Sequence, residues 1–445
     1  MAADPPTPHD PGPTLRRTLG LLETTVGGVG IILGAGIYAL VGEAAGKAGD
    51  AVWLSFLIAA LMAAVIGLSY AELASAFPRA GADYEYTHQA LGPRASFVVG
   101  WLIVIANLVA AAAVALGFGR YLNSFIDITP TAGAVVALVV ATLVAFVGIR
   151  QAVWVAIVLT LVELSGLVLI VAVGVPHLGD VDLSEAQHGA TGVFGGAALI
   201  MFAFIGFQQI ATLSEETVDA HRVIPRAMLL AIGITGILYL VVSIAAVSVL
   251  GWEALSDSRA PLADVAAESL GDEAEDVVAA IALFSTSNTI LLVLIAASRM
   301  IYGMAGRRAL PRFLAWVHPG VRTPARAIVL SLLVSGGFAL TGDIGLVAGA
   351  TNFAVFIGFA AVNLSLIVLR YTHPDIERPF RVPLSIGRMP VLPIIGLASV
   401  AFLTVNLETD ALLVGFGLFL TGVVAMELLQ LWRPEGSSPR NGSGS

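Results

Sequence analysis

Twelve long apolar runs divide the chain, and they constrain its fold more than any other feature of the sequence. An α-helix rises 1.5 Å per residue, so about 20 apolar residues cross the hydrocarbon core of a bilayer. Because the runs are continuously apolar and do not alternate in polarity, they predict membrane-spanning helices and not barrel strands. The predicted spans are 20–42, 52–76, 96–124, 132–149, 152–176, 193–217, 227–251, 275–304, 326–342, 347–370, 391–407 and 410–431.

The composition supports a membrane protein and argues against several other classes. Only 12% of the 445 residues are charged and the mean hydropathy is +0.92, whereas soluble domains carry about 25% charged residues. The chain has no cysteine, which excludes disulfides, thiolate metal sites and cysteine nucleophiles. The seven histidines form no HExxH pair, and the net charge of −9 gives no reason to expect a nucleic-acid partner.

The basic residues predict which way the spans cross the membrane. With the N-terminus inside, 19 of the 22 lysines and arginines fall on the cytoplasmic side, and only Lys47, Arg120 and Arg259 fall outside. This asymmetry is what the positive-inside rule describes. The first 15 residues lack the short apolar core of a cleavable signal peptide. We therefore expect a multi-pass protein of the cytoplasmic membrane with both termini in the cytoplasm.

Two of the predicted spans contain glycines that weaken a helix. The first span holds five glycines between Gly27 and Gly36, each costing about 1 kcal/mol relative to alanine. They are either a close-packing face for neighbouring helices or the mark of a helix unwound at mid-membrane. The sixth span places Gly206 among aromatic residues and follows it with Gln208 and Gln209.

Interrupted helices at corresponding positions of two halves are typical of transporters built from inverted repeats. An unwound helix exposes N–H groups at the start of one half-helix and C=O groups at the end of the other. The N–H end attracts a carboxylate and the C=O end attracts an ammonium or a metal cation. A zwitterionic amino acid presents both of these groups, and such a site needs no charged side chain.

A series of short motifs follows in a characteristic order and spacing: Val29-Gly30, Gly34 to Tyr38, Tyr70 to Leu73, Phe77 to Gly81, Tyr84 to Tyr86, Gly100-Trp101, Phe202 to Phe207, Glu215-Glu216, Ile224 to Ala227 and Ser298 to Ala305. Through these motifs the chain resembles the amino acid–polyamine–organocation superfamily of permeases over roughly residues 15–430. The resemblance implies an all-α membrane protein of the LeuT-like fold, which is a five-plus-five inverted repeat followed by two helices.

On that fold the chain divides into five parts. Residues 1–18 are a cytoplasmic tail, 19–176 the first repeat, 193–370 the second repeat and 391–431 the last two helices, and 432–445 are a disordered cytoplasmic tail.

The resemblance also implies a substrate site at the two interrupted helices. The substrate carboxylate would meet N–H groups of Gly34, Ala35 and Gly36. The ammonium would meet the carbonyls of Ile32, Phe202 and Ile205, and Ala203 and Gly206 belong to the same site. Phe202 takes the place of an aromatic gate, or else it is core packing. Glu72 and Glu215 lie where a salt-bridge gate or plain interfacial charges are expected.

The chain departs from many proton-coupled relatives at two positions. Glu163 stands where they carry a lysine in the fifth span, and Gln208 stands where they often carry an acidic residue. Small residues three positions either side of Glu163 suggest that it faces the bundle, and an intramembrane carboxylate is by default a functional-site hypothesis. Glu163 is a proton carrier, a ligand for sodium or a structural hydrogen-bonded residue. Ser285 and Thr286, in the eighth span, are possible oxygen partners for Glu163.

These features predict a secondary transporter that moves an amino acid by alternating access, in symport with H⁺ or Na⁺ and without a cofactor. The substrate is expected to be small or apolar, because no acidic residue or arginine lies near the predicted site. An exchanger on the same scaffold and a non-transporting sensor are the alternatives. An enzyme is not expected, since the spans hold no nucleophile–base set or metal-ligand cluster. Apolar surface faces lipid in any case, so the composition leaves a homodimer open.

Overall fold

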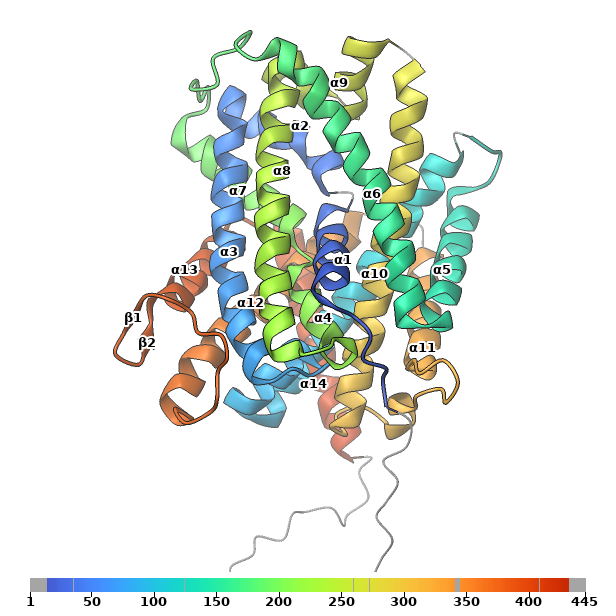
Figure 1. The fold of residues 1–445 in the computed structure, drawn as a ribbon, viewed down its shortest axis with the longest axis vertical. Helices are drawn as coiled ribbons and strands as arrows, with labels where there is room; N and C mark the ends of the chain where they lie inside the picture. The colour runs from blue at the N-terminus through green and yellow to red at the C-terminus, as the bar shows by residue number, and fades with distance from the viewer. Residues whose placement is uncertain are drawn as a thin grey trace, which may run out of the picture.

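A computed structural model describes residues 14–34, 36–123, 125–258, 260–271, 273–340, 345–407 and 409–431. Helices make up most of this part of the chain (Figure 1). The α-helices are α1 (Leu21–Leu33), α2 (Gly36–Ala48), α3 (Val52–Ala76), α4 (Ala82–Asn123), α5 (Pro130–Val147), α6 (Ile149–Gly174), α7 (Gly189–Phe204), α8 (Ala220–Asp257), α9 (Pro261–Leu270), α10 (Glu273–Gly306), α11 (Ala325–Ala339), α12 (Gly345–Thr372), α13 (Val391–Val405) and α14 (Thr409–Leu431).

The remaining elements are short. Four 3₁₀ helices, η1 (Gly49–Ala51), η2 (Val175–His177), η3 (Phe207–Glu216) and η4 (Arg312–Ala315), join or extend the α-helices. Within the described residues, a single antiparallel hairpin, β1 (Ser385–Ile386) and β2 (Met389–Pro390), lies between α12 and α13.

Every apolar run that was expected to be helical contains a helix. Among the described residues, nine helical segments are long and apolar enough to cross a bilayer, and three shorter apolar helices cover 325–339, 391–405 and 412–428. The protein is therefore an all-α, multi-pass membrane protein. The predicted tail 432–445 lies outside the described residues, as do residues 1–13.

The first predicted span, 20–42, is not one helix. α1 ends at Leu33 and α2 begins at Gly36, with Gly34 between them at φ +34°. A positive φ disfavours side chains with a Cβ atom, so glycine permits the chain to leave the helical path here. Of the two interpretations of the glycine cluster, the interruption is the one that the structure adopts at Gly34. Ala35, predicted to lie in the substrate site, falls outside the described residues.

The sixth predicted span, 193–217, is also interrupted. α7 ends at Phe204, Gly206 adopts φ +135°, and the chain continues as the 3₁₀ helix η3 and not as an α-helix. Three-residue turns tighten the path of this half of the span. Both interruptions occur at a glycine with positive φ, in the two helices that the glycine pattern singled out.

Two helices extend beyond the ranges that apolarity alone defines. α4 begins at Ala82, before the predicted start at 96, and includes a kink at Gly92 followed by Pro93. α8 runs on to Asp257 through a kink at Gly251. Polar residues of these extensions, including Asp83 and Glu85, are buried by neighbouring helices, so hydropathy does not reveal them.

The interrupted helix α1 lies in the middle of the bundle. It packs against α6, α8 and α10, and α2 packs against α7 and α8 (Figure 1). This arrangement surrounds the interruption with protein on several sides. Backbone that is not helical is tolerated at membrane depth only when it is buried in protein or lines a cavity.

Candidate functional site

The two helix interruptions touch each other. A Cβ atom added at Gly206 would lie 2.9 Å from the Ile31 carbonyl oxygen, so this glycine sits directly on the end of α1. A Cβ at Gly36 would lie 2.9 Å from the Cα atom of Ala203 in α7. Two backbones can approach this closely only where side chains are absent. The predicted substrate residues Gly36, Ala203 and Gly206 are thus brought together, with Ile31 beside them.

Backbone groups that have no partner inside their own helix converge at this point. α2 starts at Gly36, and the first N–H groups of any helix have no partner inside that helix. α1 ends at Leu33, where the last carbonyls of the helix are likewise left without helical partners. The two helix ends carry opposite partial charges. An ammonium carboxylate is a chemical match for this pair of ends.

Tyr239 on α8 is a site residue that the sequence-based predictions missed. Its hydroxyl group lies 2.9 Å from the Ile32 carbonyl oxygen and 2.8 Å from that of Leu33, and 3.3 Å from that of Ala203. The Ile32 carbonyl, predicted to receive an ammonium, therefore has a hydroxyl donor in this structure. A tyrosine inside an apolar span was the available signal, because a buried tyrosine hydroxyl normally finds a partner.

The remaining predicted residues of the sixth span, which is α7 and η3, have different roles. The Phe202 carbonyl accepts a bond from the Ile205 N–H at 3.1 Å, which closes the last turn of α7. Both side chains are half-buried. The Gln208 side-chain oxygen accepts a hydrogen bond from the Gly206 N–H at 2.9 Å, so Gln208 stabilises the backbone at the interruption. Gln208 does not contact the Glu163 cluster through any hydrogen bond found among the described residues.

Glu163 is the centre of a second polar cluster. Its side chain is fully buried in α6 and accepts a hydrogen bond from the Ser285 hydroxyl at 2.6 Å. The Asn288 amide donates to the Thr160 hydroxyl at 2.9 Å. Thr286, the other predicted partner, instead donates to the Ala282 carbonyl of its own helix. The predicted pairing of the fifth and eighth spans, which are α6 and α10, therefore forms around Glu163 through Ser285 and not Thr286.

Two oxygen atoms of this cluster have no partner. Glu163 Oε2 and Asn288 Oδ1 are buried, and neither has a hydrogen-bond donor within the described part of the chain. Buried acceptors are nearly always satisfied, and a buried carboxylate without a cation is costly. Both oxygens therefore fit a site that takes up a positive species, either a proton on the carboxylate or a hard cation with oxygen ligands.

Three contacts connect this cluster to the helix interruptions. Gly30 of α1 packs against Thr160 and Asn288 so closely that a Cβ would lie 2.8 Å from the Asn288 amide nitrogen. The Tyr38 hydroxyl, on α2, donates to the Glu163 backbone carbonyl at 3.3 Å. Thr289 lies 2.9 Å from the Cβ position of Gly34. A displacement of α1 or α2 would therefore change contacts both at the helix interruptions and in the Glu163 cluster.

Replacing Gly30 with alanine is expected to destabilise the protein by about 1–3 kcal/mol, because the added methyl group overlaps Thr160 and crowds Asn288. Thermal unfolding of the purified protein in detergent measures the change. Gly27→Ala is the matched control, since no atom lies within 4 Å of its Cβ position. Equal melting temperatures for the two variants would contradict the close packing of α1 against α6 and α10.

Ion pairs gather where α3, α10 and α12 end. Arg299 binds Glu216 through two hydrogen bonds of 3.0 and 2.9 Å, and both side chains are fully buried. Glu72 binds Arg370 and Arg378, which confirms the predicted pairing of Glu72 with arginine. Of the two alternatives given for Glu215, the ion pair does not form, because no arginine of the described residues lies within 4 Å of its carboxylate. Glu215 accepts a bond from the Ala80 N–H at 3.2 Å, and its neighbour Glu216 makes the ion pair.

Comparison with known proteins agrees with this architecture. A family model described as amino acid permease matches residues 19–426. An uncharacterised transporter of Mycobacterium tuberculosis is 33% identical over 425 residues, covering 95% of this chain and 93% of the relative. A methylthioribose transporter and a branched-chain amino acid permease of Bacillus subtilis are 29% and 27% identical, over 86% and 88% of this chain and 87% and 89% of their own lengths. These matches confirm the resemblance to the amino acid–polyamine–organocation superfamily, and the chain belongs to the amino acid permease family.

Proposed function

We propose that the protein moves an amino acid across the cytoplasmic membrane by alternating access, in symport with a proton or a sodium ion. The observation that carries the proposal is the meeting of two interrupted helices, α1–α2 and α7–η3, at glycines with positive φ. The substrate carboxylate binds the N–H end of α2, and the ammonium binds carbonyls at the ends of α1 and α7. Opposite helix ends supply the charge for both groups.

The proposal assigns twelve spans to the chain, with both termini in the cytoplasm. The three shorter apolar helices are then spans as well, packed against longer neighbours. The first five spans and the next five form the inverted repeats, which puts the interruptions at the first span of each repeat. The positive-inside rule supports this topology because it would put 19 of the 22 basic residues on the cytoplasmic side.

The side chains around the interruptions favour a small or apolar substrate. Ile31, Ala203 and Thr289 lie against the glycines, and Tyr239 covers the carbonyls. None of these side chains is charged, so a charged substrate side chain would lose its hydration without gaining a partner.

Glu163 is proposed to couple the ion to this movement. Its unpartnered oxygen and that of Asn288 lie beside Thr160, which packs on Gly30 of α1. Binding a proton or a sodium ion there satisfies buried oxygens in one arrangement of α1 and not in another. A ligand shifts a conformational equilibrium only by binding one state more tightly, and the close contact of Gly30 with Thr160 and Asn288 supports such a difference.

The ion pairs are proposed to close the cytoplasmic side in this conformation. Glu216–Arg299 and Glu72–Arg370 join segments that are distant in sequence. Opening toward the cytoplasm would then require some of these pairs to separate.

Gly36→Ala is the variant that tests the backbone site. Its methyl group would lie 2.9 Å from the Ala203 Cα atom, which pushes the two interruptions apart. We expect the affinity for the transported amino acid to fall by about tenfold or more. Radioligand binding to the purified protein measures this. Gly117→Ala on α4 is the control, because nothing lies within 4 Å of its Cβ position. Unchanged affinity in Gly36→Ala would rule out a substrate at the interruptions.

A further inference from the structure

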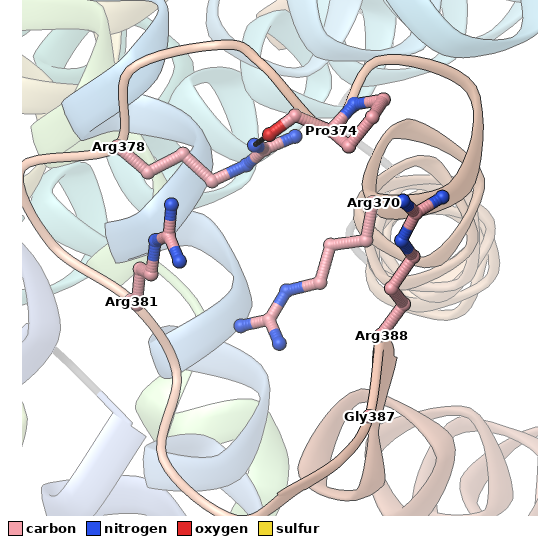
Figure 2. A pocket seen from close by; sticks show the side chains of 6 residues that line it. All are labelled: Arg370, Pro374, Arg378, Arg381, Gly387 and Arg388. Atoms are coloured by element: carbon pink, nitrogen blue, oxygen red, sulfur yellow. Dashed lines mark hydrogen bonds between the residues drawn. The ribbon is translucent and has the colours of Figure 1, made fainter.

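A pocket of about 240 Å³ opens at the end of α12, away from the helix interruptions. The residues that line it are Arg370, Pro374, Arg378, Arg381, Gly387 and Arg388. Figure 2 shows the four arginine side chains arranged around the opening, with Arg378 and Arg381 on one side and Arg388 on the other. Arginine is the side chain best suited to grip phosphate, because its planar fork of donors matches phosphate oxygens.

The positive charge in this pocket is not balanced by the protein. Glu72 accepts hydrogen bonds from Arg370 at 3.0 Å and from the Val382 N–H at 2.7 Å, and it lies 3.3 Å from Arg378. No acidic side chain of the described residues lies within 4 Å of Arg381 or Arg388. Four guanidinium groups thus face one carboxylate, which leaves three positive charges.

The surroundings of Arg378 lower its pKa. Burial lowers the pKa of the Arg378 guanidinium, the Glu72 carboxylate raises it, and the charges of Arg381 and Arg370 lower it further. Like charges held together in this way repel one another, and an anion in the pocket relieves the repulsion. The pocket therefore has both the donors and the field that an anion needs.

The pocket lies next to the end of α12, a helix that is long and apolar enough to cross a bilayer. Its loop, residues 373–390, connects two apolar helices, α12 and α13. The β1–β2 hairpin in this loop exposes Leu384, Ile386 and Met389, which are 68%, 76% and 44% accessible. Apolar side chains exposed beside basic ones are the composition of a segment that dips into the lipid headgroup layer.

We propose that this pocket binds the phosphate group of an anionic membrane lipid, with the exposed apolar side chains of the hairpin resting in the adjoining acyl layer. Arg381 and Arg388 are the charges available to hold the phosphate, because Arg370 and Arg378 are engaged by Glu72. A free phosphate ion would use the same arginines but would gain nothing from Leu384, Ile386 and Met389. Those three side chains are the reason that the lipid is the better candidate.

The test titrates the full-length protein in a neutral detergent with short-chain phosphatidylglycerol, short-chain phosphatidylcholine or inorganic phosphate, and it counts bound molecules by native mass spectrometry. We expect saturable binding of phosphatidylglycerol, and binding about thirtyfold weaker in the double variant Arg381→Gln/Arg388→Gln, because each arginine near a membrane surface contributes about one kcal/mol. Ile386→Ser is expected to weaken binding of phosphatidylglycerol while leaving that of inorganic phosphate unchanged.

The matched control is Arg150→Gln/Arg312→Gln, which removes the same charge from two exposed arginines elsewhere. An equal loss of phosphatidylglycerol binding in this control would show diffuse surface charge and overturn the pocket assignment. Equally tight binding of phosphatidylcholine, or of inorganic phosphate, would overturn the assignment of an anionic lipid.

Discussion

Glu163→Gln is expected to abolish accumulation of the amino acid against its gradient. A difference of two pH units supplies about 2.7 kcal/mol per proton, enough for roughly 100-fold accumulation by a carrier coupled to one proton. Glutamine keeps the shape of Glu163 and its bond to Ser285, but it neither exchanges a proton nor offers a negative charge to sodium. In proteoliposomes we expect the ratio of internal to external substrate to stay near one under either ion gradient, while exchange of labelled for unlabelled substrate continues.

Glu43→Gln is the control for this experiment, because it makes the same chemical change on an exposed part of α2. It should accumulate substrate as the unaltered protein does. Normal accumulation by Glu163→Gln, with the same dependence on the imposed ion, would remove Glu163 from the coupling mechanism and leave it a structural role.

Removal of Arg299 is expected to cause the largest loss of stability of any change considered. Its guanidinium group and the Glu216 carboxylate are both fully buried and joined by two hydrogen bonds. Arg299→Ala leaves the carboxylate buried without its partner, which typically costs about 3–5 kcal/mol. Denaturant titration of the purified protein in detergent measures this as a fall in the free energy of unfolding.

Two further variants show whether the cost comes from an uncompensated charge. Arg222→Ala breaks an exposed pair with Asp219 and should cost less than about 1 kcal/mol. The double variant Arg299→Met/Glu216→Leu removes both charges and should be more stable than Arg299→Ala alone. If Arg299→Ala lost no more than Arg222→Ala, the pair could not be buried as the structure has it.

The helices could be predicted because the bilayer imposes a simple rule on the sequence. A span must be long, apolar and internally hydrogen-bonded, so each range from 52–76 to 410–431 was visible as an apolar run. The interruptions at Gly34 and Gly206 were indicated by glycines, which weaken a helix, although at Gly34 the sequence left close packing as the alternative. What hydropathy could not supply was the buried polar start of α4, because protein and not lipid surrounds it.

The contacts of the site depend on tertiary packing, and here the sequence was less informative. Glu215 and Glu216 are adjacent acidic residues, and only the turn of η3 decides which of them meets Arg299. Ser285 and Thr286 are likewise adjacent, and the rotation of α10 turns Ser285 toward Glu163. Tyr239 acts across helices, from α8 to the end of α1, so no local pattern pairs it with Ile32.

Uptake into proteoliposomes of a mixed panel of labelled amino acids is the most direct test of the central claim. It is run under an imposed pH gradient, an imposed sodium gradient, and neither. The account predicts that a small or apolar amino acid accumulates under one of the two gradients and not without it. Accumulation driven by protons would make Glu163 a proton carrier, and accumulation driven by sodium would make it part of a cation site. Uptake that needs only internal amino acid, or no uptake of any amino acid, would contradict ion-coupled symport.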